Sequence, residues 1–384
     1  MTEASNQVPD LEFRRALAQC ADGTLLACYQ CGTCTAICPL NVPVRRLIRG
    51  AQLGIRDMAV GEALWMCATC KQCEVACPKG VDITGIIHAL RELSYKERKA
   101  PPKLESALWR VYEDGTAWEG KKSERGRWAE GLGLKVGKPA QHLLYVDDAA
   151  SFDPRLQHIT RSVVSVLNAA GVDFAILGEK EKSSGDEVYH IGEGGFLEEL
   201  AQSNIDSVKG IGANDIITIS PHTRSVFKDV YPKYGDVPPV FHYTEFFSDM
   251  LDKGLLKPGH PHDGSSLTVT YHDPCYLGRY GGVYEEPRKL LESIPGVKLT
   301  EMDDVKSNAL CCGGGGGGMY FESEGERPSH RRVAQADESG ASIMATACPF
   351  CVLNFEDGVK TVGSSIKIRD VAEILAGSIG NGGA

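Results

Sequence analysis

Hydrophobic residues recur with a helical period in the first hundred residues of the chain. Apolar side chains follow the spacing i, i+3, i+4 and i+7 at Val44, Leu47, Ile48 and Ala51. Gly54 then provides a stop for this helix. Asp82 can cap a second helix, whose apolar face is formed by Ile83, Ile86, Ile87 and Leu90. The pattern predicts an α-helical N-terminal domain over residues 1–100.

The pattern weakens between residues 101 and 141. Two consecutive prolines, a mixed-charge stretch at 121–127 and the glycines at 131 and 133 are typical of a linker. Tryptophan is most often a packing anchor, and this segment contains Trp109, Trp118 and Trp128. We therefore expect a linker that wraps over a neighbouring surface.

From Gln141 onward, short β-rich runs alternate with helical runs. Strands are predicted at 142–146, 172–177, 215–220, 267–272, 297–302 and 341–347. Helices are predicted at 158–170, 195–208, 222–231, 284–294 and 328–339. Such alternation is typical of parallel sheets covered by helices. The expected fold class is α+β multidomain, with the helical domain followed by two α/β domains at 142–262 and 263–384.

Composition and charge restrict the possible partners. The chain has 384 residues, of which 42% are hydrophobic and 24% charged, as in soluble globular proteins. No apolar run approaches a membrane span, and the first residues do not form a signal peptide, so a cytoplasmic protein is expected. The net charge of −10 argues against nucleic acid or an anionic membrane as the main partner. Docking to a membrane subunit stays open.

Fourteen cysteines in a reducing compartment indicate metal ligands rather than disulfides. Two runs share the spacing C-x2-C-x2-C-x3-C-P, and they are Cys28, Cys31, Cys34 and Cys38, then Cys67, Cys70, Cys73 and Cys77. In two-cluster ferredoxins the fourth cysteine of each run binds the other cluster. One [4Fe–4S] cluster is therefore assigned to Cys28, Cys31, Cys34 and Cys77. The other is assigned to Cys38, Cys67, Cys70 and Cys73. Paired zinc knuckles are the alternative, although they do not require the third and fourth cysteines. Cys20 belongs to neither run and is expected to be a small buried hydrophobe.

A second set of cysteines lies in the C-terminal third of the chain. Its members are Cys275, Cys311, Cys312, Cys348 and Cys351. Six glycines follow Cys312, and glycine can adopt backbone angles that bring N–H groups close to a bound anion. Five sulfurs beside such a loop indicate a metal–sulfur centre. The alternative is a free thiol pair on a flexible loop.

The same frame occurs earlier in the chain without its sulfurs. A shift of 127 or 128 positions superimposes the five cysteines on Asp148, Ser183, Ser184, Ser220 and Thr223. Locally, Ile219-Ser-Pro-His-Thr223 matches Ala347-Cys-Pro-Phe-Cys351. Thiolates favour iron–sulfur clusters, whereas oxygen ligands favour harder ions. The first frame is therefore predicted to be empty, with a Mg²⁺ or Zn²⁺ site at Asp148 as the alternative.

Four other polar residues are candidates for roles near the centres. His272 and Arg279 flank Cys275 and could raise the potential of the C-terminal centre or deliver a proton. Both could equally be structural hydrogen-bond partners. His222 and His242 lie in the half without cysteines, where structural roles are expected. Gly192-Glu-Gly-Gly195 is a weak nucleotide match, so flavin and nucleotide are assigned to another subunit.

These motifs resemble heterodisulfide reductase. Residues 28–90 are similar to its small ferredoxin subunit, through Cys28-Tyr-Gln-Cys-Gly-Thr-Cys34, Leu64-Trp-Met-Cys-Ala-Thr-Cys70 and Cys77-Pro-Lys-Gly-Val-Asp82. Residues 142–360 are similar to its partner subunit with two CCG domains, through Tyr271-His-Asp-Pro-Cys-Tyr-Leu-Gly-Arg279, Leu310-Cys-Cys-Gly313 and Ala347-Cys-Pro-Phe-Cys351. The fused order resembles the D-type subunit. Related chains include iron–sulfur subunits of glycerol-3-phosphate, glycolate and lactate dehydrogenases, and proteins that accompany electron-transfer flavoproteins or benzoyl-CoA reductases.

The resemblance implies two cubane clusters and one noncubane [4Fe–4S] cluster, the latter held by the five C-terminal cysteines. Disulfide cleavage between two facing noncubane clusters is not expected, because the first frame lacks sulfur. The predicted function is an electron-transfer subunit that works between a flavin or ferredoxin partner and a terminal reductase or dehydrogenase. One alternative is a reductase that acts directly on a thiol, a disulfide or another small substrate. Others are the iron–sulfur subunit of a hydroxy-acid or glycerol-3-phosphate dehydrogenase, and a scaffold. The sequence names neither donor, acceptor, nor direction of flow.

Overall fold

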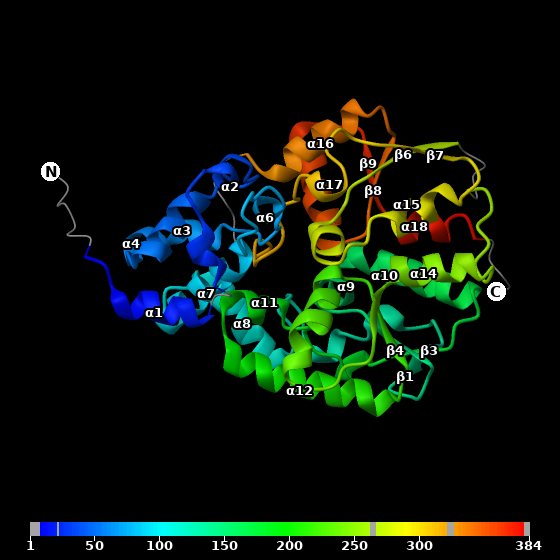
Figure 1. Ribbon diagram of the computed structural model, residues 1–384. Helices are drawn as coiled ribbons and strands as arrows, with labels where there is room; N and C mark the ends of the chain where they lie inside the picture. Colours follow the sequence, from blue (N-terminus) through cyan, green and yellow to red (C-terminus); the bar gives the residue numbers. More distant parts are fainter. Residues whose placement is uncertain (1–7, 21–22, 262–265, 321–325, 380–384) are drawn as a thin grey trace.

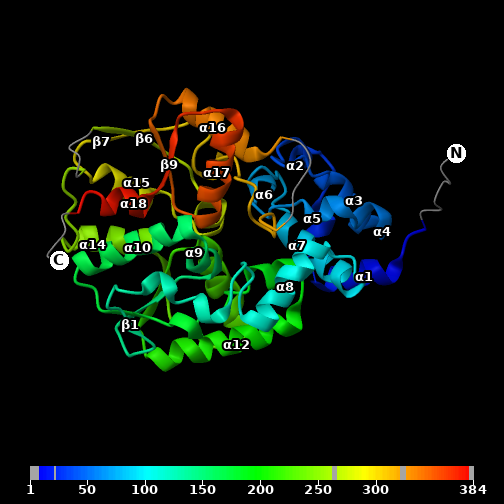
Figure 2. The same ribbon diagram turned by 180° about the vertical axis from the view of Figure 1, so that it is seen from behind.

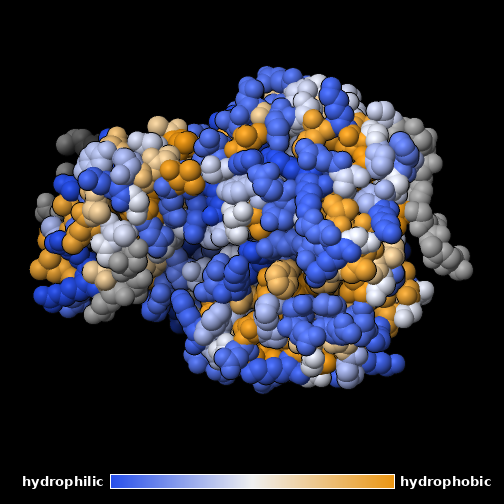
Figure 3. Space-filling view, turned by 45° about the vertical axis from the view of Figure 1, so that its right-hand side comes forward, coloured by the Kyte–Doolittle hydropathy of each residue, from blue (hydrophilic) through white to orange (hydrophobic). Residues whose placement is uncertain are grey.

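The computed structural model describes residues 8–20, 23–261, 266–320 and 326–379, without the side chains of Gln19 and Cys20. A helical N-terminal lobe projects to one side of a body made of two stacked α/β halves (Figures 1 and 2). The space-filling view shows the same projection and a surface on which polar and apolar side chains are interspersed (Figure 3). Within the described residues, no helix is long and apolar enough to cross a membrane.

The N-terminal lobe is built from short helices around the two cysteine runs. They are α1 (Leu11–Cys20), α2 (Thr33–Ala36), α3 (Val44–Leu53), α4 (Arg56–Ala59), α5 (Glu62–Trp65), α6 (Gln72–Val75) and α7 (Ile83–Lys96). The two predicted helices are confirmed as α3 and α7. Gly54 ends α3 with φ of 71°, and Asp82 caps α7 by accepting a hydrogen bond from the Gly85 amide.

The first α/β half contains a five-stranded parallel sheet in the order β1-β3-β2-β4-β5. Its strands are β1 (Lys135–Val136), β2 (His142–Tyr145), β3 (Phe174–Ile176), β4 (Asp215–Thr218) and β5 (Val240–His242). The helices are α9 (Asp148–Phe152), α10 (Pro154–Ala169), α11 (Asp186–Ile191), α12 (Gly194–Ile211), α13 (Pro221–Ser225) and α14 (Tyr243–Asp252). The predicted helix at 222–231 changes after Ser225 into a π-helical turn, so it is not one regular α-helix.

The second half repeats this topology with a four-stranded parallel sheet in the order β7-β6-β8-β9. Its strands are β6 (Leu267–Tyr271), β7 (Val297–Thr300), β8 (Ile343–Thr346) and β9 (Lys367–Asp370). Its helices are α15 (Glu285–Glu292), α16 (Pro328–Glu338), α17 (Pro349–Val362) and α18 (Val371–Ala376). In the first half β2 lies between β3 and β4, and in the second half β6 lies in the same way between β7 and β8. The predicted α+β class with two parallel sheets is confirmed.

The two halves meet along helices. Figure 1 shows α10 and α14 of the first half beside α15 and α18 of the second, and contacts join α10 to α18 and α14 to α15. The Arg155 guanidinium on α10 binds Glu373 on α18 through two hydrogen bonds of 2.8 and 2.9 Å. The buried Tyr243 hydroxyl donates to Asp370 at 2.5 Å. Bidentate and buried polar pairs of this kind fix the register of the two halves.

The segment at 101–141 contains more regular structure than the weak pattern indicates. Helix α8 (Pro102–Asp114) contacts α11, and β1 pairs with β3 at the edge of the first sheet. Trp128 is buried and Trp118 stacks on Phe350 of the second half. Trp109 is 61% exposed, so its expected packing role is wrong.

Candidate metal centres

The first cysteine run and the last cysteine of the second run surround one small cavity. Cys28, Cys31, Cys34 and Cys77 all line it, together with Arg45. Cys31 is the exposed member of this group, and the others are half-buried. Helix α2, which carries Cys34, begins after Gly32, whose φ of 89° lies in the region that glycine favours. The sequence alone joins Cys77 to this group only through the ferredoxin spacing rule.

The remaining four cysteines of the N-terminal lobe lie deeper. The electrostatic neighbours of Cys73 are Cys67, Cys70 and Cys38, so the four thiols share one environment. Burial raises the pKa of the Cys67 thiol to about 12. A buried group of thiols with raised pKa values needs a cationic centre before it can ionise. The donor set therefore fits a cluster of iron ions.

All five C-terminal cysteines are buried in the second half, at the carboxyl edge of its sheet. Cys275 follows β6, Cys348 follows the adjacent β8, and Cys351 lies in the first turn of α17. Adjacent parallel strands bring their following loops together at this edge. The sulfurs of Cys275 and Cys311 are 4.0 Å apart, and those of Cys351 and Cys312 are 3.3 Å apart.

Two buried polar groups beside these thiols point to a further hydrogen-bond acceptor. Arg332 donates from Nε to Nδ1 of His272 at 3.2 Å, so the imidazole proton resides on Nε2. Burial and the charge of Arg332 hold the pKa of His272 well below its usual value, which keeps the ring neutral. Nε2 of His272 and Nη2 of Arg279 have no hydrogen-bond partner within the described residues. The charge of Cys312 acts on His272, and those of Cys70, Cys275 and Cys311 act on Arg279.

The sulfide and thiolate atoms of a cluster at the five cysteines would accept such hydrogen bonds, because buried donors are normally satisfied. The residues present therefore fit an iron–sulfur cluster. His272 and Arg279 lie beside the C-terminal cysteines, as one of the two interpretations of the sequence expects.

The glycine run has a role that the sequence did not reveal. A Cβ atom on Gly315 would lie 2.5 Å from the Ala68 carbonyl oxygen, and one on Gly316 would lie 2.5 Å from that of Cys67. The glycines thus let the loop after Cys312 press against the backbone of the second ferredoxin run.

Buried arginines complete this junction between the lobes. Arg91 is fully buried on α7 and donates to backbone carbonyls of the ferredoxin loop, the first half and the glycine run. Its guanidinium reaches the carbonyl oxygens of Cys67 at 2.7 Å and of Gly316 at 2.9 Å. Arg279 donates to the Cys70 carbonyl and, at 2.8 Å, to that of Ala309. Because these arginines bind carbonyls and not carboxylates, no sequence pattern identified the contacts.

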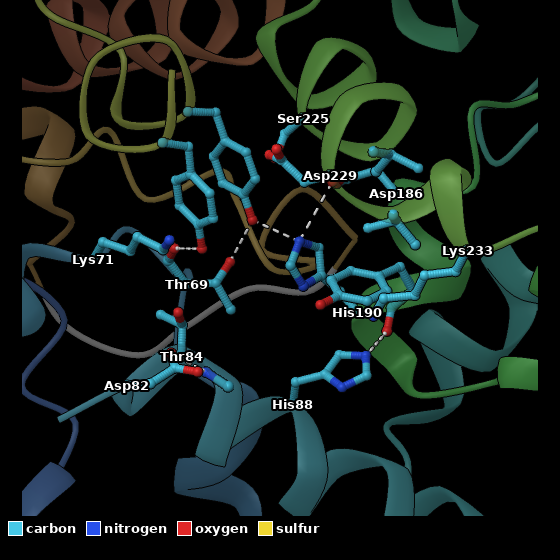
Figure 4. Close-up of a pocket in the computed structure, with 16 residues that line it drawn as sticks. Thr69, Lys71, Asp82, Thr84, His88, Asp186, His190, Ser225, Asp229 and Lys233 are labelled. Carbon is cyan, nitrogen blue, oxygen red and sulfur yellow. Dashed lines mark hydrogen bonds and ion pairs between the residues drawn. The ribbon is translucent and has the colours of Figure 1, made fainter. Parts of the chain in front are cut away.

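The three parts of the chain also enclose a cavity of about 210 Å³ (Figure 4). In its wall the Tyr276 hydroxyl lies 2.6 Å from Oγ1 of Thr69 and 2.5 Å from Nε2 of His190. Thr69 stands between two ferredoxin cysteines, and Tyr276 directly follows Cys275. The cavity wall therefore contains residues that adjoin Cys70 and Cys275 in the sequence.

His222 belongs to the C-terminal centre, although its residue number places it in the other half. Its ring stacks on Tyr276 with centroids 3.9 Å apart, and Nδ1 lies 3.1 Å from Asp186. Burial opposes ionisation of Cys348, but hydrogen bonds from Cys351 and His222 lower the pKa of this thiol to about 6. The pair with Asp186 fits the structural role expected for His222, and the structure also brings its ring beside Cys348, because the two halves face each other. His242, in contrast, is buried and bonded at both nitrogens, to Thr244 and to the Ile219 carbonyl.

The first frame contains a hydrogen-bonded network in place of sulfurs. Asp147, and not the aligned Asp148, accepts from the Ser184 hydroxyl at 3.0 Å and from the Thr223 hydroxyl. Asp147 has φ of 68°, which is uncommon outside glycine. Ser183 accepts from the Gly185 amide. Ser220 accepts from the Thr223 amide and caps α13.

Asp148 is neutralised from outside the half. The buried Arg125, from the segment between lobes, pairs with Asp148 and lies 3.4 Å from Glu181. The Ala117 amide from the same segment donates to Asp148 at 2.7 Å. The positive charge beside Asp148 is thus supplied by a buried guanidinium, where the sequence left a Mg²⁺ or Zn²⁺ ion as the alternative.

Comparisons with known proteins agree with this division. Residues 27–81 match the family described as "4Fe-4S dicluster domain", and residues 150–228 and 269–356 match "Cysteine-rich domain". A "Probable iron-sulfur-binding oxidoreductase FadF" of Bacillus subtilis is 37% identical over 85% of this chain and 48% of its own length. An "EtfAB:quinone oxidoreductase" of Syntrophomonas wolfei is 32% identical over 83% of this chain and 47% of its own.

The D-type subunit of the dihydromethanophenazine:CoB–CoM heterodisulfide reductase of Methanosarcina barkeri is similar over almost its whole length. It is 29% identical over 92% of this chain and 94% of its own. The chain thus spans about half of the first two relatives and nearly all of the third.

Proposed function

This chain belongs to the iron–sulfur oxidoreductase proteins that join a 4Fe-4S dicluster domain to cysteine-rich domains, and on that premise we propose that it is an electron-transfer subunit. Its thirteen assigned cysteines would hold two cubane clusters and one noncubane [4Fe–4S] cluster. Such clusters accept and release one electron at a time. The protein contributes the spacing, the burial and the hydrogen bonds of the ligands.

The observation that carries the proposal is the contact between two cysteine groups. Cys70 of the ferredoxin lobe is buried in one cluster with Cys275, Cys311 and Tyr276 of the second half. Ligands assigned to the second cubane and to the C-terminal centre are therefore packed against each other. The proposed order of centres begins at the first cubane, whose ligand Cys31 is exposed. An electron that enters near Cys31 would find its next positions progressively more buried.

The first α/β half, whose frame lacks cysteines, favours electron transfer rather than disulfide cleavage. A mechanism with two facing noncubane clusters needs a second set of cysteines, and the first frame has Arg125, Asp147 and Asp148 in a closed network instead. We assign the donor side to a flavoprotein or ferredoxin. We assign the terminal side to a reductase or dehydrogenase subunit, and one relative is named as a subunit of a heterodisulfide reductase.

A kinetic comparison tests the relay. Cys73→Ser should remove the second cubane and leave the ligand sets of the other two centres intact. After rapid mixing with a ferredoxin-sized reductant, we expect the freeze-quenched EPR signal of the C-terminal centre to develop at least about tenfold more slowly in the variant, because the middle carrier is lost. An unchanged rate, with iron analysis proving loss of only one cubane, would reject the relay. A Cys20→Ser variant provides a matched control outside the assigned ligands.

The cavity of Figure 4 favours a second candidate. Because Tyr276 follows Cys275 and faces about 210 Å³ of space, a small thiol, disulfide or carbonyl substrate could be reduced there directly. Steady-state reduction of such a substrate by the isolated, chemically reduced chain would favour this function. A dehydrogenase role would instead require a flavin subunit.

A further inference from the structure

The surface around Cys31 carries cations that form no ion pair within the described residues. We define the cationic collar as Arg45, Arg49 and Lys79, all of them exposed. No ion pair joins any of the three to a carboxylate in the described part of the chain. The whole chain, in contrast, has a net charge of −10. The collar is therefore a positively charged patch on a protein whose net charge is negative.

Each cation is held close to the first cysteine run. Arg45 lines the cavity of the four cysteines, and its guanidinium lies 3.6 Å from the position that a Cβ on Gly32 would take. Arg49 donates at 3.3 Å to Gln52, whose side-chain amide donates to the Cys28 carbonyl at 2.8 Å. Lys79, two residues after Cys77, places its ammonium 5.9 Å from the centroid of the Tyr29 ring.

An exposed aromatic side chain lies within the same surface. Tyr29, between Cys28 and Cys31, is 58% exposed and contacts Lys79. Arginine and tyrosine are enriched at the centres of protein interfaces, where their planar groups supply contact area. Small apolar centres with a charged rim are suited to the brief encounters of redox partners.

We propose that the cationic collar is a docking surface for an acidic electron-carrier protein. This proposal rests on the proposed electron-transfer function and adds the chemistry of the partner and its point of contact. Opposite charges steer such encounters and raise the association rate, and the effect falls with ionic strength. A carrier with an acidic rim around its redox group would be held over Cys31. A carrier with a basic rim would be repelled there.

The collar favours a protein over a membrane. Three cations are a weak anchor for an anionic bilayer, because stable attachment takes a larger basic cluster or a lipid chain. Its members also surround the exposed cysteine of an assigned cluster, where close approach of a second redox group shortens the path for an electron.

Binding of an acidic flavodoxin tests this proposal on the full chain with its clusters. The triple variant Arg45→Gln/Arg49→Gln/Lys79→Gln removes the collar. The control is Lys298→Gln/Lys360→Gln/Lys367→Gln, which removes the same charge from exposed lysines of the second half. At low ionic strength, we expect collar removal to weaken flavodoxin binding by roughly tenfold, as steering by a few charges predicts, and the control to change it less than about twofold. In about 0.5 M salt, where the Debye length is only a few ångströms, the difference should disappear.

Equal effects of the two triple variants, or no salt dependence, would overturn the proposal. Tighter binding of the basic protein cytochrome c than of flavodoxin would do the same. A vesicle assay gives the third outcome. If collar removal abolished sedimentation with anionic vesicles but left flavodoxin binding unchanged, the surface would be assigned to a membrane and a protein partner would be refuted. Dithionite reduction of the cubanes, followed by EPR in each variant, separates these results from failure of the electron-transfer function.

Discussion

Cys70 and Cys311 lie in the same buried cluster of side chains, although one belongs to the ferredoxin lobe and the other to the second α/β half. Cys311 has the largest influence on the Cys70 thiol, and its hydrogen bond raises the pKa of Cys70 well above the usual value. The contact is maintained by Arg279, which donates to the Cys70 carbonyl, and by Tyr280, whose hydroxyl donates to the Thr69 carbonyl at 2.6 Å. The lobes therefore meet where the assigned ligands are.

Gly316→Ala should disrupt this meeting point. Gly316 has φ of 59°, and an added Cβ would lie 2.5 Å from the Cys67 carbonyl oxygen. Because this oxygen belongs to the backbone, it cannot move away without a cost in free energy. Overpacking and backbone strain together should cost about 2–4 kcal/mol of unfolding free energy. Anaerobic thermal unfolding of the variant measures this loss.

Gly340→Ala is the matched control, because Gly340 has φ of 72° but open space around its Cα. This control should lose only about 1–2 kcal/mol from backbone strain. If both alanine variants lost the same stability, the close approach of the glycine run to the ferredoxin loop would be contradicted.

His272→Phe should lower the midpoint potential of the C-terminal centre. The variant removes the Nε2 donor, which has no partner within the described residues, and hydrogen bonds to cluster sulfurs raise the potential. The expected shift is roughly 60 mV, corresponding to a tenfold change in a one-electron equilibrium. A redox titration followed by EPR measures it. His272→Gln keeps an N–H donor and should recover part of the shift, whereas equal potentials in all three proteins would exclude the hydrogen bond.

Arg125→Met should destabilise the first half without loss of iron. The substitution leaves the buried carboxylate of Asp148 without its cation, and breaking a buried pair costs roughly 3–5 kcal/mol. Denaturant unfolding under anaerobic conditions tests the magnitude. Neutralising the exposed Lys122 in the same segment should change stability by less than about 0.5 kcal/mol. Iron loss in Arg125→Met would mean that the first frame supports a metal centre.

Glu181 should make stability depend on pH. Burial raises the pKa of its carboxyl from 4.5 to about 7, against the opposing charge of Arg125, while Asp147 repels the ionised form. Below pH 4.5 the group is protonated in both states. Between this value and 7 the folded protein retains a proton that the unfolded chain releases, so stability falls as pH rises through this window.

The loss amounts to roughly 3 kcal/mol, from a shift of about 2.5 units at 1.36 kcal/mol per unit. Glu181→Gln should show a smaller decrease in unfolding free energy between about pH 5 and pH 8 than the unchanged protein. Identical pH profiles would show that Glu181 is not held in its protonated form.

Local patterns in the sequence predicted local structure well. The apolar spacing before Gly54, the Asp82 cap and six of the nine described strands appear where the pattern placed them. The edge strands β1, β5 and β9 were missed. Each contains exposed residues, so it lacks the continuous buried run that marks strands such as β3 and β8. The start of α10 at Pro154 was also missed, although Asp153 followed by proline is a recognised helix start.

Contacts between distant segments could not be predicted. The duplication aligned Asp148 with Cys275, but it is Asp147, with its positive φ of 68°, whose carboxylate accepts hydrogen bonds from Ser184 and Thr223. Arg125 reaches Asp148 from the segment predicted to be a linker. Such pairings depend on how folded lobes dock, and no periodicity along the chain records them.

The location of iron in the folded protein tests the central claim most directly. Anomalous diffraction at the iron edge, from crystals grown without oxygen, should show three groups of iron and about 12 iron atoms in total. They should lie among Cys28, Cys31, Cys34 and Cys77, then among Cys38, Cys67, Cys70 and Cys73, and then among the five C-terminal cysteines, with the middle group nearest to the last. Iron beside Asp147, Ser184 and Thr223, or none among the C-terminal cysteines, would contradict the account.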